Sequence, residues 1–200
     1  MNSAGLPWPG EVLPRSFYAR DPRRVGPELL NKVLVRGDRA ARLVEVEAYL
    51  GSEDPGAHSY RGMTRRNATM FGPAGHLYVY FTYGLHWCAN TVCGDEGVGV
   101  AVLLRAGAPL AGLDLMRTAR PAARRDRDLC SGPARLCQAF GIDRGHDGAD
   151  LVAGDAGIVV VNDGVGPPAE PVRTTRVGLT AGGEHPWRWY VDGDPNVSKR

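Results

Sequence analysis

The sequence predicts an α+β fold: a single domain with a mainly antiparallel, curved β-sheet, flanking helices and a protruding β-hairpin. Three observations support this prediction. Expected strands outnumber expected helices, and neighbouring strands are joined by turns too short for a parallel crossover. The 200 residues, 43% of them hydrophobic, suffice for one sizeable core. Residues 1–14 are small and proline-rich, so we expect a loose lead there and one domain over residues 15–200.

The first half of the chain reads as one helix followed by paired strands. Pro22 suits the first turn of a helix that runs to about Leu30. The dipeptide Gly37-Asp38 predicts a turn between two strands, and Tyr83-Gly84 predicts a hairpin tip between two more. The four strands expected around these turns cover residues 32–36, 42–49, 76–82 and 85–93.

The second half adds helices and further strands. An apolar strand over residues 97–105 is expected to end on Arg105. Helices are expected over 110–120 and 133–140, the second with Pro133 in its first turn and Gly141 just past its end. Strands over 157–161 and 187–191 flank a loop rich in proline and glycine.

The strand over residues 42–49 carries two carboxylates on one face. Alternate side chains of a strand point the same way, so Glu45, Glu47 and Tyr49 share one side of it. One interpretation is a solvated strand face, since charged residues are usually exposed. The other is the wall of a site that uses carboxylate chemistry.

The loop over residues 51–75 favours the second interpretation. Loops of this length inside a compact domain are usually functional or disordered. His58, Tyr60, Met70 and Phe71 favour a packed loop. Its positive charge comes from Arg61, Arg65 and Arg66 and is suited to phosphate contacts. We therefore predict a functional loop.

Composition limits the classes of protein and of partner. The net charge is only +2, but the 24 basic residues include lysine only at positions 32 and 199. Arginine forms fixed, forked contacts to phosphate, although a GC-rich genome gives the same bias. The chain has no apolar run of membrane-spanning length and no secretion signal, so we expect a cytoplasmic protein. The spacing of the four cysteines favours buried thiols over a metal site.

Several motifs taken together resemble the alkyladenine (3-methyladenine) DNA glycosylase family, over roughly residues 25–191. They are Glu47-Ala48-Tyr49-Leu50-Gly51, the His58 loop, Arg66-Asn67, Met70-Phe71, Gly75-His76-Leu77-Tyr78-Val79-Tyr80, Tyr83-Gly84, Asn90, Leu103-Leu104-Arg105-Ala106 and Leu129-Cys130-Ser131-Gly132-Pro133. An ordered set across almost the whole chain is far more specific than any single motif.

The resemblance implies a base-excision repair enzyme that extrudes a damaged purine from duplex DNA and hydrolyses its N-glycosidic bond. Catalysis would rest on Glu47 as the general base, with Arg105 beside it and the Val177 carbonyl oxygen holding the attacking water. The base-binding pocket implied by the resemblance comprises Tyr49, His58, Tyr80, Asn90 and Met70, and the implied DNA contacts comprise Tyr83 as the intercalating residue, Arg61, Arg65, Arg66 and Gly178.

Two local expectations test this resemblance. A two-residue hairpin loop would put Tyr80 and Asn90 on opposite faces, so we predict an odd loop, such as Thr82-Tyr83-Gly84, or a bulge. Two dry carboxylates side by side would repel each other, so we expect Glu45 to be paired or solvated.

The remaining expectations concern cofactors, partners and alternatives. The resemblance implies a monomer that acts on double-stranded DNA with damaged purines, in the cytoplasm or at the nucleoid. We expect no cofactor and no metal. We also expect no strand-cleaving lyase activity, because that chemistry needs an amine nucleophile and Lys32 and Lys199 lie outside the matched pocket. Methylated, deaminated and etheno-bridged purines differ by single contacts, so the motifs do not select among them.

Two other functions are alternatives to the glycosylase interpretation. The family fold resembles the C-terminal domain of formyltransferases, so a non-catalytic nucleic-acid-binding module is one alternative. A carbohydrate hydrolase using Glu45 and Glu47 is the other, although carboxylates on one strand face do not flank a scissile bond.

Overall fold

A computed structural model describes residues 8–82 and 84–199. Tyr83, the expected intercalating residue, lies outside the described residues. The described chain forms a nine-stranded sheet in the order β1-β7-β2-β3-β6-β5-β4, with β9 paired to β3 and β8 to β9.

Its strands are β1 Glu11–Val12, β2 Val33–Arg36, β3 Arg39–Tyr49, β4 Leu77–Thr82, β5 His86–Cys93, β6 Val100–Ala111, β7 Ile158–Asn162, β8 Val172–Thr174 and β9 Arg188–Tyr190. The α-helices are α1 Arg15–Tyr18, α2 Pro22–Leu29, α3 Leu113–Ala119 and α4 Pro133–Phe140, and short 3₁₀ turns include η1 Gly51–Glu53 and η2 Ala68–Phe71.

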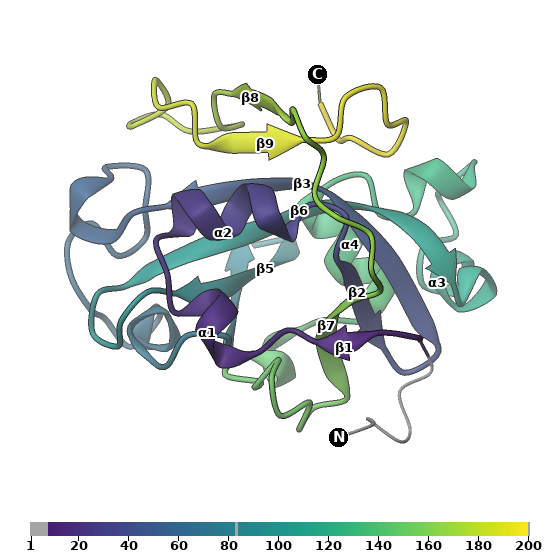
Figure 1. The fold of residues 1–200 in the computed structure, drawn as a ribbon, viewed down its shortest axis with the longest axis horizontal. Helices are drawn as coiled ribbons and strands as arrows, with labels where there is room; N and C mark the ends of the chain where they lie inside the picture. Colours follow the sequence, from purple (N-terminus) through teal and green to yellow (C-terminus); the bar gives the residue numbers. More distant parts are fainter. Residues whose placement is uncertain (1–7, 83, 200) are drawn as a thin grey trace.

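The sheet curves around a hydrophobic core, and the expected α+β class is confirmed (Figure 1). Helix α2 packs on β3, while α4 packs on β5 and β6 from another side. Fully buried Leu29, Leu104 and Phe140 belong to the main core cluster. No helix within residues 8–82 and 84–199 is long and apolar enough to cross a membrane.

Strand β3 is the central element for the site. It pairs with β6 along one edge, and with β2 and then β9 along the other. Val46 and Ala48 belong to the main core cluster, so Glu45 and Glu47 point away from that core. The expected alternation over the acidic strand is therefore confirmed.

The strand expected to end on Arg105 is longer than predicted. It begins at Val100 and continues to Ala111, because β3 starts at Arg39 and offers a partner to the second half of β6. Arg105 therefore lies in the middle of a strand and not at its end. The following helix starts at Leu113, not at residue 110, since residues 110 and 111 still belong to β6. Gly112 separates them with φ 69°, where an added Cβ would lie 2.5 Å from the Asp38 carbonyl oxygen.

The N-terminal segment is ordered earlier than expected. Glu11 and Val12 pair with β7, and Leu13 is buried. The sequence also did not predict α1 or β8, which have only four and three residues. Elements this short carry too few residues for a periodic pattern, so tertiary pairing decides them.

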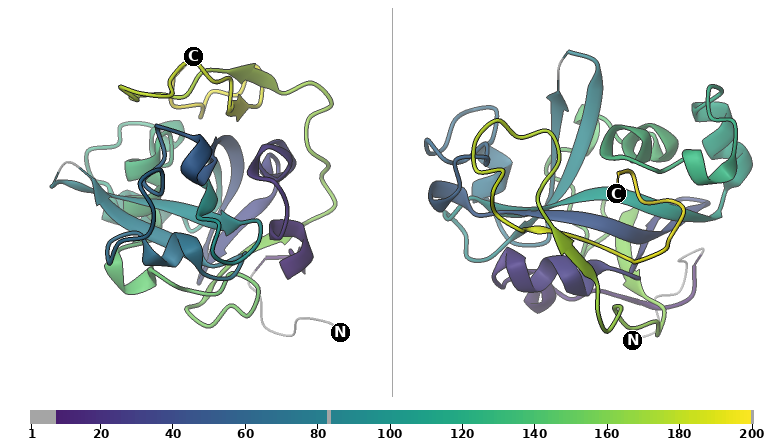
Figure 2. Two further views of the ribbon diagram at one scale, coloured as in Figure 1. Left: turned by 90° about the vertical axis from the view of Figure 1, so that its left-hand side faces the viewer. Right: turned by 90° about the horizontal axis from the view of Figure 1, so that it is seen from above.

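Strands β4 and β5 form an antiparallel hairpin that stands out from the rest of the sheet (Figure 2). Thr82 pairs with His86, so an odd number of residues connects the strands. The connection starts one residue later than Thr82-Tyr83-Gly84, because Thr82 remains in β4. Tyr78 pairs with Asn90 and Tyr80 with Cys88, which places Tyr80 and Asn90 on one face, as predicted.

Candidate active site

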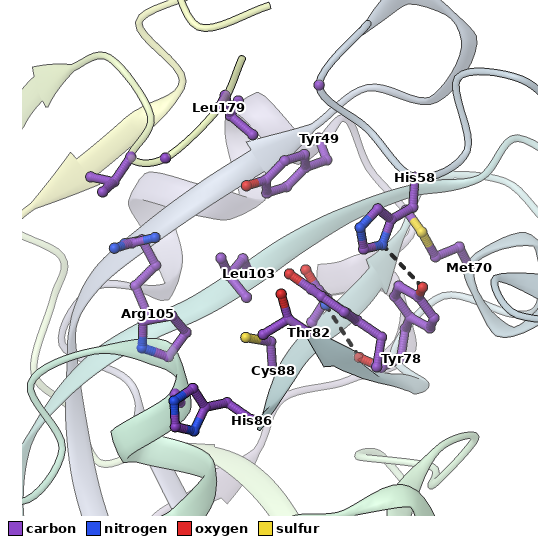
Figure 3. A pocket seen from close by; sticks show the side chains of 17 residues that line it. Tyr49, His58, Met70, Tyr78, Thr82, His86, Cys88, Leu103, Arg105 and Leu179 are labelled. Carbon is purple, nitrogen blue, oxygen red and sulfur yellow. Dashed lines mark hydrogen bonds between the residues drawn. The ribbon is translucent and has the colours of Figure 1, made fainter. Parts of the chain in front are cut away.

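A pocket of about 330 Å³ opens beside the base of the hairpin (Figure 3). Its walls come from β3 to β6, the loop after β3, the start of α4 and the segment before β9. Its lining comprises Tyr49, Gly56, His58, Met70, Tyr78, Tyr80, Thr82, His86, Cys88, Asn90, Leu103, Arg105, Pro133, Ala134, Val177, Gly178 and Leu179.

The Glu47 carboxylate lies directly behind this lining and is fully buried. Oε1 accepts a hydrogen bond from the Val177 backbone N–H at 2.7 Å, and Oε2 accepts one from the Tyr49 hydroxyl at 2.9 Å. Arg105 Nη1 lies 3.3 Å from Oε1. All three partners line the pocket, so the carboxylate is held by the pocket wall itself.

Glu45 is paired, as predicted. Its Oε1 accepts hydrogen bonds from Arg105 Nε at 3.0 Å and Arg188 Nε at 2.7 Å, and its Oε2 accepts one from the Ser198 backbone N–H at 2.7 Å. Burial by itself raises the pKa of Glu45, but Arg105, the Ser198 bond and Arg188 together bring that pKa below its usual value. The side chain is a buried, compensated anion.

Arg105 bridges the two carboxylates because the pairing of β3 and β6 is irregular there. Glu45 pairs with Ala106 and Val46 with Leu104, which leaves Arg105 without a direct partner. Such a bulge re-aims a side chain. Although burial lowers the pKa of Arg105, Glu47 and Glu45 raise it above its usual value. Its guanidinium therefore stays charged.

Aromatic rings form the opposite wall. The rings of Tyr78 and Tyr80 are stacked, with centroids 5.5 Å apart, and the His58 ring meets Tyr80 edge-on at 4.4 Å. His58 Nδ1 is hydrogen bonded to the Tyr78 hydroxyl at 3.1 Å. Burial raises the pKa of Tyr78 to about 12. His58 keeps an exposed edge, yet partial burial and nearby Arg66 lower its pKa, so this wall is uncharged at neutral pH.

The loop that presents His58 is held by its own polar groups. Asn67 Nδ2 donates to the His58 carbonyl oxygen at 2.9 Å, and Ser59 Oγ donates to the Gly99 carbonyl oxygen at 2.5 Å. Met70 is buried, as expected for a packed loop, whereas Tyr60 is 45% exposed. The expected packing of the loop is thus correct for Met70 and for Phe71, which packs against the cluster of Met70, and wrong for Tyr60, while His58 is exposed although its ring contacts Tyr80.

Most residues expected in the site meet in this pocket. Tyr49, His58, Met70, Tyr80, Asn90, Arg105, Val177 and Gly178 line it. Val177 contacts Glu47 through its N–H, whereas the resemblance implied a role for its carbonyl oxygen. Arg61, Arg65 and Arg66 are exposed and do not line the pocket, and Arg66 Nη2 donates to the Phe81 carbonyl oxygen of β4.

Sequence reasoning missed several lining residues. Tyr78 and Cys88 share a strand face with Tyr80 and Asn90, so strand alternation with the predicted odd connection would have identified them. Leu103 follows from alternation with Arg105. Pro133 and Ala134 carry no such signal, because only the packing of α4 against β5 and β6 brings them to the pocket.

Fold and site together define an α+β protein with an aromatic pocket over a buried carboxylate and arginine. A model of the methylpurine-DNA glycosylase family matches residues 16–195. The chain belongs to this family, which confirms the resemblance seen in its motifs.

Relatives from several bacteria cover nearly the full chain. A Burkholderia cenocepacia protein named "Putative 3-methyladenine DNA glycosylase" is 58% identical over 198 residues, which are 98% of this chain and 96% of that protein. Proteins of the same name from Streptomyces avermitilis and Carboxydothermus hydrogenoformans are 50% and 46% identical. These two alignments cover 93% and 94% of this chain, and 90% and 100% of the respective relatives.

Proposed function

We propose that the protein is a DNA repair glycosylase that extrudes a damaged purine from duplex DNA and hydrolyses its N-glycosidic bond. One observation carries this proposal: the Glu47 carboxylate is buried behind an aromatic pocket and held there by the pocket lining. Family membership and the names of the relatives support DNA as the substrate.

Glu47 is assigned the role of general base. Glycoside hydrolysis proceeds through an oxocarbenium-like sugar, and a carboxylate activates water on the face opposite the leaving group. Arg105 supplies a fixed positive charge 3.3 Å from this carboxylate. The Tyr49 hydroxyl and the Val177 amide each donate to one oxygen of this carboxylate, which fixes its orientation for taking a proton from water.

The pocket accounts for the flat substrate. A base inside a duplex must leave the stack before an enzyme reaches its anomeric carbon, and aromatic faces then hold it. Tyr49, His58 and Tyr80 are assigned this role. Tyr83, which lies outside the described residues, is assigned by the family resemblance to the gap that the extruded base leaves, entered from the minor groove. Arg61 and Arg65, both exposed, are assigned contacts to the phosphate backbone.

A panel of duplex oligonucleotides tests the proposal. Each duplex carries one methylated, deaminated or etheno-bridged purine, and the measurement is release of the free base under single-turnover conditions. Release from at least one lesion duplex, with none from an undamaged duplex, is the expected result. Binding without release from any duplex would instead support a non-catalytic nucleic-acid-binding module.

Asn90 is expected to reject undamaged guanine. It is buried in the pocket wall and its Nδ2 is bonded to the Tyr78 carbonyl oxygen at 3.3 Å, so its side chain cannot move aside for an exocyclic amino group. One such contact is worth roughly a few kcal/mol of discrimination. Asn90→Ser should therefore release guanine faster, while release of adenine changes little.

The control for this variant is Thr91→Ser on the same strand. Thr91 is fully buried but does not line the pocket, so its substitution reports any general loosening of β5. A guanine-to-adenine ratio that is equal in the Asn90→Ser variant and the wild type would contradict the role of Asn90.

The enzyme is expected to leave an intact abasic strand. Glycosylases that also cut DNA attack the sugar with an amine and form a Schiff base. Burial lowers the pKa of Lys32, which favours a nucleophilic amine. However, Lys32 does not line the pocket, and its Nζ donates to Asn162 Oδ1 at 2.8 Å. Treatment with borohydride during turnover should trap no covalent adduct of protein and DNA. A trapped adduct would show that an amine takes part.

A further inference from the structure

We infer that the buried ion pair of Arg176 and Asp54 positions the reacting centre, by holding the Val177 amide against Glu47 and the Tyr49 ring against the pocket. The inference rests on the proposed function, because it takes Glu47 as the general base. Neither Arg176 nor Asp54 lines the pocket, so both act through other residues.

The pair is a fully enclosed, two-point contact. Arg176 Nη1 lies 2.5 Å from Asp54 Oδ2 and Nη2 lies 2.7 Å from Oδ1, and neither side chain is accessible to solvent. The guanidinium also donates to the carbonyl oxygens of Ala48 at 3.0 Å and Gly182 at 2.7 Å. It therefore joins β3, the loop after β3 and the segment that precedes β9.

Asp54 extends this junction along the loop. Its Oδ2 accepts from the Leu50 backbone N–H at 3.1 Å and its Oδ1 from the Gly56 backbone N–H at 2.9 Å. These bonds determine how the chain leaves β3 and enters the loop that carries His58. The same carboxylate thus holds the start of the loop and the arginine fork.

Two contacts connect the pair with the reacting centre. Val177, the next residue after Arg176, donates its N–H to Glu47 Oε1 at 2.7 Å. The Arg176 Cζ atom lies 4.7 Å from the centroid of the Tyr49 ring and 5.1 Å from that of Trp187. Because Tyr49 lines the pocket and Arg176 does not, the guanidinium supports this ring from behind.

Stability alone does not account for this pair. A buried ion pair is a weak source of stability, and well-packed apolar residues of similar volume often replace it without loss. Arg176 even keeps its Nε buried without a hydrogen-bond partner. Apolar residues cannot supply the four directional bonds that Arg176 makes to Asp54, Ala48 and Gly182.

The test separates positioning from folding by replacing both partners at once. The double variant Asp54→Leu/Arg176→Met removes the partners of backbone groups at Ala48, Leu50, Gly56 and Gly182, so the midpoint of thermal unfolding should fall, and base release is measured at a temperature at which the variant is fully folded. Single-turnover release of a methylated purine should fall about tenfold to a hundredfold, since small misplacements of reacting groups have effects of this size. Binding of a duplex with a tetrahydrofuran abasic analogue should stay within about threefold, because it needs no Tyr49 stacking.

A control uses a second arginine–carboxylate pair, formed by Arg42 of β3 and Asp163, whose side chains are largely but not fully buried. Arg42 and Asp163 are also joined at two points, with Nη2 2.7 Å from Oδ2, and neither residue lines the pocket. The variant Arg42→Met/Asp163→Leu should release base within about twofold of the wild-type rate. An equal loss of rate in both double variants would overturn the inference, because any such pair would then have the same effect.

Further outcomes decide the remaining cases. A folded Asp54→Leu/Arg176→Met variant that releases base at the wild-type rate overturns the inference. If that variant does not fold, Arg176→Lys decides, since lysine keeps the charge but cannot make the forked contact. Normal release by a folded Arg176→Lys variant also overturns it. Absence of base release by the wild type from every lesion duplex would instead refute the proposed function, whereas normal release by Glu47→Gln would refute the assignment of Glu47 on which the inference rests.

Discussion

Glu47→Gln should lower single-turnover base release by about a hundredfold or more, the usual cost of losing a positioned general base. Binding of lesion duplex should change by only a few-fold, because glutamine keeps the shape of the side chain. Its amide oxygen can still accept from the Val177 N–H or the Tyr49 hydroxyl, the two donors that now hold Glu47. The measurement is release of a methylated purine with enzyme in excess, alongside equilibrium binding.

Glu45→Gln is the matched control for this variant. Glu45 lies two residues earlier on the same strand face and is also fully buried, but of its partners Arg105, Arg188 and Ser198 only Arg105 lines the pocket, whereas all three partners of Glu47 do. We expect it to lose mainly stability and to keep most of its rate of base release. Wild-type turnover by Glu47→Gln would contradict the assignment of the base.

Arg105→Met should destabilise the protein by about 3–5 kcal/mol at neutral pH, the usual effect of removing one partner from a buried ionic cluster. The substitution leaves Glu45 and Glu47 buried on one strand face. Arg188 and the Ser198 amide would still compensate Glu45. No cation that contacts Glu47 would remain among the described residues. Base release should fall as well, because Arg105 forms part of the pocket wall.

The stability that Arg105→Met loses should depend on pH, and the pKa of Glu45 determines the direction of this dependence. In the wild type, the pKa of Glu45 is lowered by Arg105 despite burial, so its contribution to stability is full at pH 5–7 and is lost only as the pH falls below the ordinary value of 4.5. In the variant, only Arg188 and the Ser198 amide oppose the effect of burial on Glu45, so its pKa is higher than in the wild type and acid protonates this carboxyl at a higher pH. The difference in free energy of unfolding should shrink from pH 7 to pH 5, as measured by urea denaturation. A constant difference would contradict the ionic explanation.

Prediction from sequence succeeded where a local pattern decides the structure. Helix α4 covers the predicted residues from Pro133 to Phe140, because proline favours the first turn and Gly141 adopts a left-handed φ of 64° after the last. The prediction that Glu45 and Glu47 share one face was also correct, because the alternation of side chains is a local property of the extended backbone.

Prediction was less successful where a distant partner decides the structure. Strand β6 continues past Arg105 because β3 pairs with it, and the irregularity at Arg105 arises from that pairing. The predicted hairpin connection began one residue too early. Whether Thr82 belongs to the strand or to the connection depends on the register with β5. Arg176 and Asp54 stand 122 positions apart, in segments with no pattern to join them.

The sequence by itself determined the family, the α+β class and eight of the 17 residues that line the pocket, because ordered motifs and strand alternation are properties of the chain itself. Only the tertiary structure decided the environment of Glu47. One of its hydrogen-bond donors, the Val177 amide, lies 130 positions away and belongs to the backbone, which every residue shares. Burial, charge compensation and the direction of a hydrogen bond depend on which distant segments pack together, so no local pattern could have specified them.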